Sequence, residues 1–273
     1  MSQVGTLNRP GRPLKVYAWS FLVILYAPIL LLPLFSFNNS DYIAFPIAEF
    51  TFARYVELWN NGPIWTALWN SVLLGAVVAV VSTVLGIFAA KALTRYRMPG
   101  RGTIFGFMML PLVVPGIIFG VALLILLNQA GVKLSLFTIG LGHILVCTPF
   151  AIATLMPRFE GFDPSIEEAS ADLGENAWWT FWRVTFPIVF PGILASLMLT
   201  FTISFDEFIM AFFLAGTEQT LPIFIWNQLR FPERLPGTLA LATVIMTLSF
   251  ILVLASLSLA LGGVQDKKTG DAQ

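Results

Sequence analysis

The sequence contains little charge and very few residues suited to covalent or metal chemistry. Only 11% of its 273 residues are charged, which is about half of the roughly 25% found in soluble domains. Cys147 is the single cysteine, so an intrachain disulfide is excluded. There is no Gly-Lys dipeptide and no H-E-x-x-H, so neither a phosphate-binding P-loop nor that zinc motif is present. Basic and acidic residues balance at 15 each, and net charge therefore indicates no nucleic-acid partner.

The single histidine, His143, lies inside a long apolar run. An ionisable residue at membrane depth is a functional candidate, and Cys147, one turn later, is the only nearby second ligand for a metal. A neutral imidazole that is hydrogen-bonded between helices is the favoured interpretation. We therefore expect no metal and no cofactor. The spans also lack a convincing Ser–His pair or paired aspartates, which disfavours an intramembrane enzyme.

Long apolar runs dominate what is present. Hydrophobic residues make up 57% of the chain, and about 20 consecutive apolar residues can span a membrane as a helix. The sequence predicts an all-α membrane protein that forms one domain over residues 1–273. Six candidate spans lie at about 15–37, 64–92, 103–127, 134–157, 187–214 and 238–262. In the second, Gly75-xxx-Ala79 and Ser82-xxx-Gly86 place small residues on one helical face, which favours close helix packing within the chain or against another subunit.

The placement of basic residues predicts the orientation in the membrane. The first run is interpreted as an uncleaved span, because its apolar part exceeds the usual 7–15 or so residues of a signal peptide and no A-x-A site follows. Six spans place both termini on one side. Eleven of the fifteen basic residues fall on that side, namely Arg9, Arg12, Lys15, Lys91, Arg95, Arg97, Arg101, Arg158, Arg183, Lys267 and Lys268. The positive-inside rule therefore predicts cytoplasmic termini.

A polar stretch, "EEASADLGENAWWTFWRVTFP" (167–187), separates two apolar runs. Asp163 before Pro164 is typical of a helix start, and Gly174 can end that helix in a left-handed turn. The segment "NAWWTFWRV" is expected to form a second short helix that leads to Pro187. An interfacial helix with Trp at the headgroup level would account for the aromatic residues. The acidic residues and the lack of a Lys/Arg face favour a protein partner instead.

The same stretch resembles the EAA loop of the permease subunits of binding-protein-dependent ABC importers. The family pattern is an E-A-A triplet, a glycine at fixed spacing, and a hydrophobic-x-hydrophobic-Pro ending. The matching residues are Glu168, Ala169, Ser170, Gly174, Val184, Phe186 and Pro187. Two substitutions are mild: Ser170 replaces the second Ala and Phe186 replaces a common Leu. The segments "SFDEFIMAFFLAG", "TLPIFIW" and "NSVLLGAVVAVVSTVLG" are also similar to the second permease of spermidine/putrescine importers, so the resemblance covers most of the chain.

The resemblance implies a type I ABC importer permease fold, with six transmembrane helices and a coupling helix at about 164–176. That helix, within a cytoplasmic loop of about 158–186, would dock in a groove of an ATPase subunit and transmit nucleotide-driven closure to the spans. The implied ATPase-coupling residues are Glu168, Ala169, Ser170, Asp172, Leu173 and Gly174. The implied partners are a second homologous permease, two ATPase subunits and an external substrate-binding protein, at the bacterial inner membrane. The binding protein would dock on external loops that include about 38–63 and 215–237.

Two adjacent acidic residues, Asp206 and Glu207, lie in the fifth predicted span. They follow the start of that span by about nineteen residues, or roughly 29 Å at 1.5 Å per helical residue, so they are placed near its external end. At a membrane centre each acid costs about 3 kcal/mol, so neither is expected to face lipid. They are either solvated at the interface or part of a cation-attracting site, in which Phe205, Phe208 and Trp226 add cation–π contacts. The resemblance indicates a polyamine as that cation.

The sequence leaves other functions open. Other members of the resembled family import iron, thiamine, opines or phosphonates, so the solute is less closely indicated than the family. A self-sufficient secondary carrier would need its own coupling-ion site and usually has inverted repeats with broken helices, and the sequence has no detectable repeat. The importer hypothesis predicts copurification with an ATPase, whereas the carrier and enzyme hypotheses do not.

Overall fold

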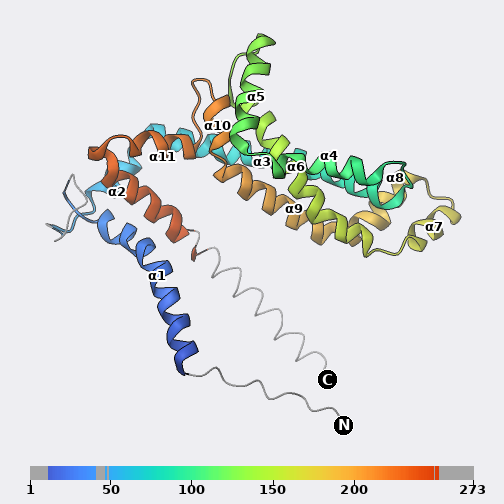
Figure 1. The fold of residues 1–273 in the computed structure, drawn as a ribbon, viewed down its shortest axis with the longest axis horizontal. Helices are drawn as coiled ribbons and strands as arrows, with labels where there is room; N and C mark the ends of the chain where they lie inside the picture. Colours follow the sequence, from blue (N-terminus) through green and yellow to red (C-terminus); the bar gives the residue numbers. More distant parts are fainter. Residues whose placement is uncertain (1–11, 41–46, 48, 249, 252–273) are drawn as a thin grey trace. The chain divides into compact units, whose positions relative to one another are not determined.

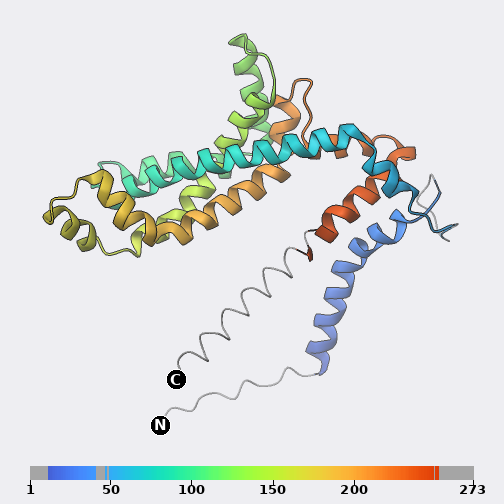
Figure 2. The same ribbon diagram turned by 180° about the vertical axis from the view of Figure 1, so that it is seen from behind.

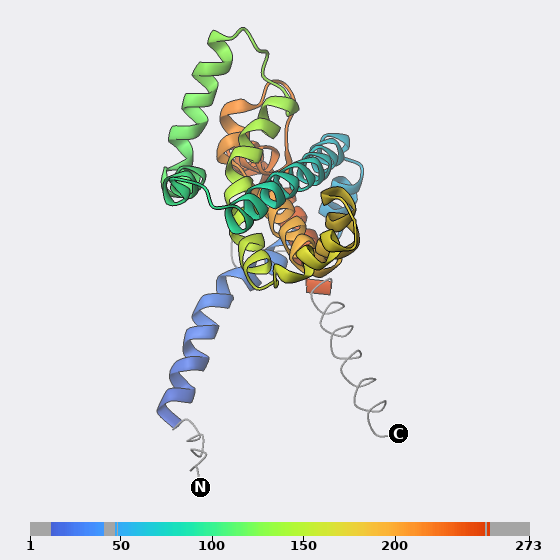
Figure 3. The same ribbon diagram turned by 90° about the vertical axis from the view of Figure 1, so that its right-hand side faces the viewer.

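The computed structural model describes residues 12–40, 47, 49–248 and 250–251. These residues form helices, turns and one isolated antiparallel bridge between Asn38 and Phe50. The chain divides into two compact units, one of residues 62–226 and one of residues 1–61 with 227–273. Figures 1, 2 and 3 show the ribbon from three sides, and each unit is described separately.

The larger unit is built on three long helices. These are α3 (Gly62–Arg95), α6 (Leu136–Glu160) and α9 (Phe186–Asp206). They pack against one another pairwise and run side by side along most of their length (Figures 1 and 2). Helices satisfy their own backbone hydrogen bonds, which is why apolar segments take this form where water is absent. Many large apolar side chains on the outer faces of these helices are exposed, as expected of surfaces that contact lipid or other subunits.

Small residues and buried hydroxyls hold the three helices together. A Cβ atom added to Gly86 of α3 would lie 2.8 Å from the Cβ of Ala151 on α6, and one added to Gly75 would lie 3.1 Å from the ring of Phe201 on α9. The hydroxyls of Thr83 and Ser196, both buried, lie 3.0 Å apart and join α3 to α9. The small-residue face of the second predicted span therefore packs within the chain, which confirms one of the two interpretations of that pattern.

Two predicted spans are interrupted. The third consists of α4 (Arg101–Val113) and α5 (Gly116–Gln129), whose axes differ by 98°. The break falls at Pro115, because proline cannot donate a helical hydrogen bond and disfavours the helical conformation of the residue before it. The fifth predicted span stops at Asp206, and a separate short helix, α10 (Ile209–Leu214), follows it. The expectation of an unbroken helix over 187–214 was wrong at this point.

Four helices within the described residues are long and apolar enough to cross a membrane, or five if the bent α4–α5 pair is one span. They are α1 (Arg12–Ser36), α3, α6 and the continuous helix Ala177–Asp206. The first three correspond to the first, second and fourth predicted spans, and the last overlaps the fifth over residues 187–206. Of the sixth, 238–262, the residues up to 248 and residues 250–251 are helical, and residue 249 and residues 252–262 lie outside the described residues.

The segments after α9 are tied to the larger bundle. In that bundle α5 packs against α10, and a Cβ added to Gly120 would lie 2.6 Å from the ring of Phe213. The start of α11 (Leu221–Leu229) is attached to α3, because the Leu221 N–H donates to the Ser71 hydroxyl over 2.8 Å. The Asn70 side chain also donates to the Gln219 carbonyl over 2.9 Å.

The smaller unit contains α1, α2 (Ala53–Trp59) and the short 3₁₀ helix η2 (Pro232–Arg234). The hydroxyls of Ser36 and Tyr55 lie 2.6 Å apart, so the end of α1 is joined to α2. The Thr51 hydroxyl accepts from the Ala53 N–H over 3.1 Å and begins α2. Of the predicted external loop 38–63, residues 41–46 and 48 lie outside the described residues.

The contact between α3 and α6 leads to a first prediction. Gly86→Val forces side-chain atoms against the Ala151 backbone, and overpacking of this kind costs about 1–3 kcal/mol. Gly106→Val on α4 is the matched control, because a Cβ at that position meets nothing within 4 Å. We expect the melting temperature in detergent micelles to fall for Gly86→Val and to change much less for Gly106→Val. Equal shifts for the two variants would contradict the close α3–α6 contact.

Candidate functional site

The polar stretch after α6 forms a short helix, α7 (Ser165–Asp172), at one end of the α3–α6–α9 bundle (Figure 1). The Asp163 carboxylate accepts from the Ser165 N–H over 2.9 Å, which satisfies a free donor at the helix start. This hydrogen bond lowers the pKa of Asp163 below its usual value. Glu167 and Glu168 occupy the first turn, where the helix dipole favours anions. The predicted start of the helix at Asp163 and Pro164 agrees with these contacts.

Gly174 ends α7 as the sequence predicted. Its φ is +86°, a left-handed conformation that side chains with a Cβ rarely adopt. The Gly174 N–H donates to the Ala171 carbonyl over 2.9 Å, and the Glu175 N–H donates to the Ser170 carbonyl over 3.2 Å. This pair of bonds is the Schellman arrangement at a helix end. The chain therefore reverses sharply after Leu173.

The second short helix continues directly into α9. It consists of α8 (Ala177–Thr180), capped by the Asn176 side chain at 3.0 Å from the Trp179 nitrogen, and a π-helical turn, η1 (Phe181–Thr185). Pro187 therefore does not open a new helix but lies in the first turn of α9. Pro187 has no N–H and so cannot donate a helical hydrogen bond. The π-helical turn η1 ends two residues before Pro187.

Most of the predicted coupling residues point outward. The side chains of Glu168, Ala169, Asp172 and Leu173 are exposed, as is Gly174. Leu173 is 86% exposed, which is unusual for a leucine at a helix end and leaves an apolar side chain free to enter a partner's groove. Ser170 differs, because it is buried and its hydroxyl lies 3.0 Å from that of Thr180. Ser170 therefore joins α7 to α8 rather than facing outward.

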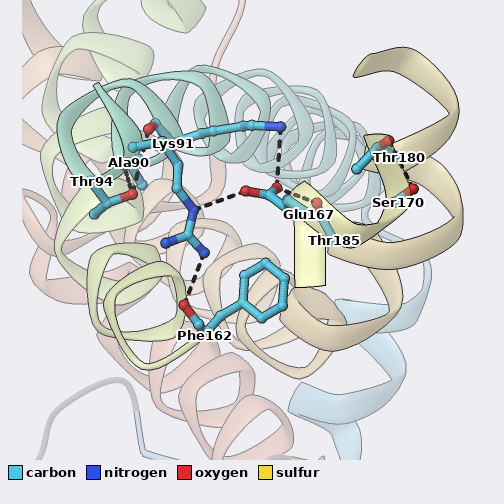
Figure 4. Close-up of polar contacts among 9 residues, drawn as sticks. Ala90, Lys91, Thr94, Phe162, Glu167, Ser170, Thr180 and Thr185 are labelled. Atoms are coloured by element: carbon cyan, nitrogen blue, oxygen red, sulfur yellow. Dashed lines mark hydrogen bonds and ion pairs between the residues drawn. The ribbon is translucent and has the colours of Figure 1, made fainter. Parts of the chain in front are cut away.

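Glu167, which we did not select as a site residue, is the best-connected residue of α7 (Figure 4). Its carboxylate lies 3.0 Å from Arg95 Nε and 3.5 Å from Lys91 Nζ, both on α3. It also accepts a hydrogen bond from the Thr185 hydroxyl on η1. The Glu167 side chain is only 16% exposed, so its charge is partly removed from water and depends on these partners.

A signal for this contact was present in the sequence. Residues three apart share one face of a helix, so Glu167 lies on the same face as Ser170, a small residue that replaces Ala in the triplet. Lys91 and Arg95 are four apart and likewise share one face at the end of the second predicted span. Spacing alone does not reveal that these two faces meet, because the contact joins segments more than seventy residues apart.

A pocket of about 320 Å³ lies between α7, α8 and the end of α3. It is lined by Lys91, Arg95, Tyr96, Pro164, Glu167, Glu168, Ala171, Glu175, Ala177 and Thr180. Both cations in this lining contact Glu167, and Glu175 pairs with Arg183. The charges of the pocket are therefore largely satisfied from within the insert and α3.

The two acids at the end of α9 have different roles. Glu207 takes an extended backbone conformation, and its carboxylate accepts from the N–H groups of Ile209 and Met210 over 2.8 and 3.1 Å. Glu207 therefore begins α10. The Asp206 side chain is exposed, and its carboxylate has no hydrogen bond or ion pair within the described part of the chain. Asp206, rather than Glu207, is available to a ligand.

The predicted aromatic residues gather only in part. The rings of Phe208 and Trp226 have centroids 5.3 Å apart, which brings together residues before α10 and in α11. Phe205 instead stacks on Phe201 of the same helix, with centroids 5.9 Å apart. Trp226 is partly exposed. Phe208 and Trp226 thus present aromatic faces near the break that follows Asp206.

The histidine is placed as the sequence indicated. His143 is buried, and its Nδ1 lies 2.8 Å from the Ser204 hydroxyl, which links α6 to α9. Cys147 is also buried, and its Sγ lies 3.7 Å from the Thr200 carbonyl. Among the described residues, no three His, Cys, Asp or Glu side chains come together as metal ligands would.

The different roles of the two acids lead to a second prediction. Glu207→Ala removes the acceptor that begins α10, and the loss of such a cap costs about 0.5–2 kcal/mol. Asp206→Ala, one residue earlier, is the matched control and removes no contact within the described residues. We expect the melting temperature in micelles to fall for Glu207→Ala only. A larger fall for Asp206→Ala would contradict this assignment.

Comparisons with known proteins agree with this geometry. The chain is 31% identical to the spermidine/putrescine transport system permease protein PotC of Escherichia coli, over 98% of both chains. It is 33% identical to the putrescine transport system permease protein PotI of Escherichia coli, over 81% of both. Its fold resembles a chain of the bacterial alginate ABC transporter solved in complex with an alginate pentasaccharide-bound periplasmic protein. That match has a TM-score of 0.66 and 17% identity, and it covers 88% of this chain and 89% of the other.

The family model for binding-protein-dependent transport system inner membrane components matches residues 82–268. This match covers more than half of the chain and includes α7, the end of α3 and α9. With several helices apolar enough to span a membrane, the protein is a multi-pass inner membrane protein, and it is a permease subunit rather than an enzyme. The chain belongs to the family of binding-protein-dependent transport system inner membrane components.

Proposed function

We propose that this chain is the permease subunit of a polyamine importer, driven by separate ATPase subunits that dock on α7. In this proposal residues 1–273 form a single six-span permease domain, paired with a second homologous permease. Two ATPase subunits lie on the cytoplasmic side, and a substrate-binding protein lies on the outer side. Both termini lie in the cytoplasm.

The observation that carries the docking proposal is that some residues of the α7 region are held within the chain while others are exposed. Glu167 and Ser170 are satisfied from within the chain, while Glu168 and Leu173 are exposed. An exposed leucine at the end of a helix that also exposes an acidic side chain is suited to a groove that is apolar at its base and basic at its rim. The basic residues at the same end of the bundle, Lys91 and Arg95 among them, support a cytoplasmic location for α7.

The exposure of Asp206 and the names of two relatives support a polyamine as the transported solute. Asp206 is an exposed carboxylate at the end of a long apolar helix, without a partner in the described residues. The nearby ring pair Phe208–Trp226 offers π-faces to an alkylammonium group. The names of two Escherichia coli relatives state spermidine or putrescine transport. An amine of two or more charges separated by methylenes matches a carboxylate that is flanked by aromatic rings.

The proposed mechanism follows from these contacts. A loaded binding protein docks on the outer loops, and ATP binding closes the ATPase dimer. The dimer moves α7, and the spans change from inward-facing to outward-facing. The polyamine enters the path past Asp206, and hydrolysis resets the gate. Within the chain itself the described residues supply the docking helix, the path carboxylate and the helices between them.

The docking proposal yields a third prediction. Glu168→Lys reverses an exposed charge, and Leu173→Asp removes an exposed apolar side chain. Residues that dominate an interface in this way contribute about 2 kcal/mol or more to the binding free energy. We expect at least about tenfold less ATPase to copurify with either variant. Glu233→Lys, an equal charge reversal on the exposed η2 helix, is the control and should keep the ATPase. Unchanged copurification for both α7 variants would refute the docking role.

The path proposal yields a fourth prediction, for uptake of labelled putrescine into proteoliposomes that hold the whole complex. Asp206→Asn removes the negative charge and is expected to slow uptake at least about tenfold, since a hydrogen-bonded charge is worth about 1.5–3 kcal/mol. Glu207→Gln retains an acceptor for the start of α10 and is expected to slow uptake less. Wild-type uptake by Asp206→Asn would rule out the carboxylate as the path residue. A loss of uptake in Glu207→Gln alone would assign the path carboxylate to Glu207 instead.

A further inference from the structure

The two neighbouring glutamates of α7 are held very differently. Glu168 is exposed and has no ion pair among the described residues. Glu167 is largely buried and contacts three side chains from two other elements. Only Glu168 belongs to the family triplet identified in the sequence. The contacts of Glu167 are not explained by the docking of a partner, because they point into the chain.

Arg95, at the end of α3, contacts both α7 and the segment that precedes α7. Its Nε lies 3.0 Å from a Glu167 oxygen. Its terminal nitrogen donates to the Phe162 carbonyl over 3.1 Å, and its guanidinium lies 4.8 Å from the centre of the Phe162 ring. The Arg95 side chain is only 11% exposed. A planar guanidinium fixed on two sides in this way holds one geometry.

Lys91, one turn earlier on α3, completes the connection. Its Nζ lies 3.5 Å from the other Glu167 oxygen and 5.3 Å from the centre of the Phe181 ring on η1. The Thr185 hydroxyl donates to that same oxygen. The carboxylate of Glu167 on α7 thus contacts both α3 and η1 (Figure 4).

The far end of α3 reaches the region of the proposed path. This helix has 34 residues, about 50 Å at 1.5 Å per residue. Near its other end Asn70 hydrogen-bonds to Gln219, between α10 and α11, and Ser71 hydrogen-bonds to Leu221, the first residue of α11. Between the two ends α3 packs on α6 and α9 through small residues. A rigid, closely packed helix of this kind carries a displacement from one end to the other.

We propose that Glu167 is a positioning residue for transport, which fixes α7 to the end of α3 so that displacement of α7 by a partner is delivered to α3. The inference rests on the proposed docking of an ATPase on α7. Lys91 and Arg95 are the receiving groups, and α3 conveys the movement towards the segment that contains Gln219 and Leu221. Glu168 and Leu173 contact the partner, and Glu167 transmits the displacement of α7 to α3.

The test uses the reconstituted complex with its binding protein and compares Glu167→Gln with wild type. Glutamine retains the shape and removes the charge that pairs with Lys91 and Arg95. Glu160→Gln is the matched control, because Glu160 forms an exposed ion pair with Arg101 between α6 and α4 over 3.4 Å. The readout is the number of putrescine molecules imported per ATP hydrolysed, together with the amount of ATPase that copurifies.

We expect Glu167→Gln to retain the ATPase and its hydrolysis but to import about tenfold fewer molecules per ATP, since it breaks the partly buried ion pairs of Glu167 with Lys91 and Arg95, and the loss of one partner of such a pair costs at least the equivalent of that factor. Glu160→Gln should keep the wild-type ratio. A merely structural role would lower import and hydrolysis together, so a wild-type ratio in Glu167→Gln overturns the proposal.

A second measurement does not depend on partners. In the purified full-length chain, hydrogen exchange of the α7 backbone amides is expected to be about tenfold faster in Glu167→Gln than in Glu160→Gln, with α6 and α9 unchanged. Unchanged exchange of α7 would overturn the attachment of α7 to α3. A wild-type chain that copurifies no ATPase would instead contradict the docking of α7, and the exchange result would still decide whether Glu167 fixes α7.

Discussion

The ion pairs of Glu167 with Lys91 and Arg95 are the interactions on which the polar insert depends. The insert joins α6 to α9, two helices apolar enough to lie in a membrane, and its first helix, α7, buries only Ser170, so apolar packing does not supply a fixed point for α7. A carboxylate between two cations and a hydroxyl supplies that fixed point. Since a partly buried charge without partners is costly, α7 is held in one place. Glu168 on α7 and Leu173 at its end are exposed and are then free to meet a partner.

The same constraint governs the bundle. Polar groups removed from water must find partners, and the buried hydroxyl pair Thr83–Ser196 and the pair His143–Ser204 do so between helices. Where α9 ends, Glu207 supplies acceptors to the first N–H groups of α10. Asp206 is left without such a task. Glu207 is therefore needed to begin α10, whereas Asp206 remains available to the proposed ligand.

Much of this could be predicted from the sequence, because apolar length, a helix-starting Asp-Pro and a left-handed glycine act locally. The spans represented by α1, α3 and α6 and the turn at Gly174 follow from such signals. The break at Pro115 could not be placed, since proline is tolerated in many membrane helices. The break at Glu207 could not be placed either, because two adjacent acids do not reveal which of them accepts hydrogen bonds from the start of the next helix. Glu167 was missed because its partners on α3 are distant in sequence. The path role of Asp206 stays a prediction.

The central claim is that this permease couples polyamine import to a separate ATPase. The most direct test is ATP hydrolysis by the reconstituted wild-type complex, measured with unloaded binding protein and with binding protein loaded with spermidine or putrescine. We expect hydrolysis to rise with the loaded protein well above its rate with the unloaded one. Equal rates, or stimulation only by a ligand that is not a polyamine, would contradict it.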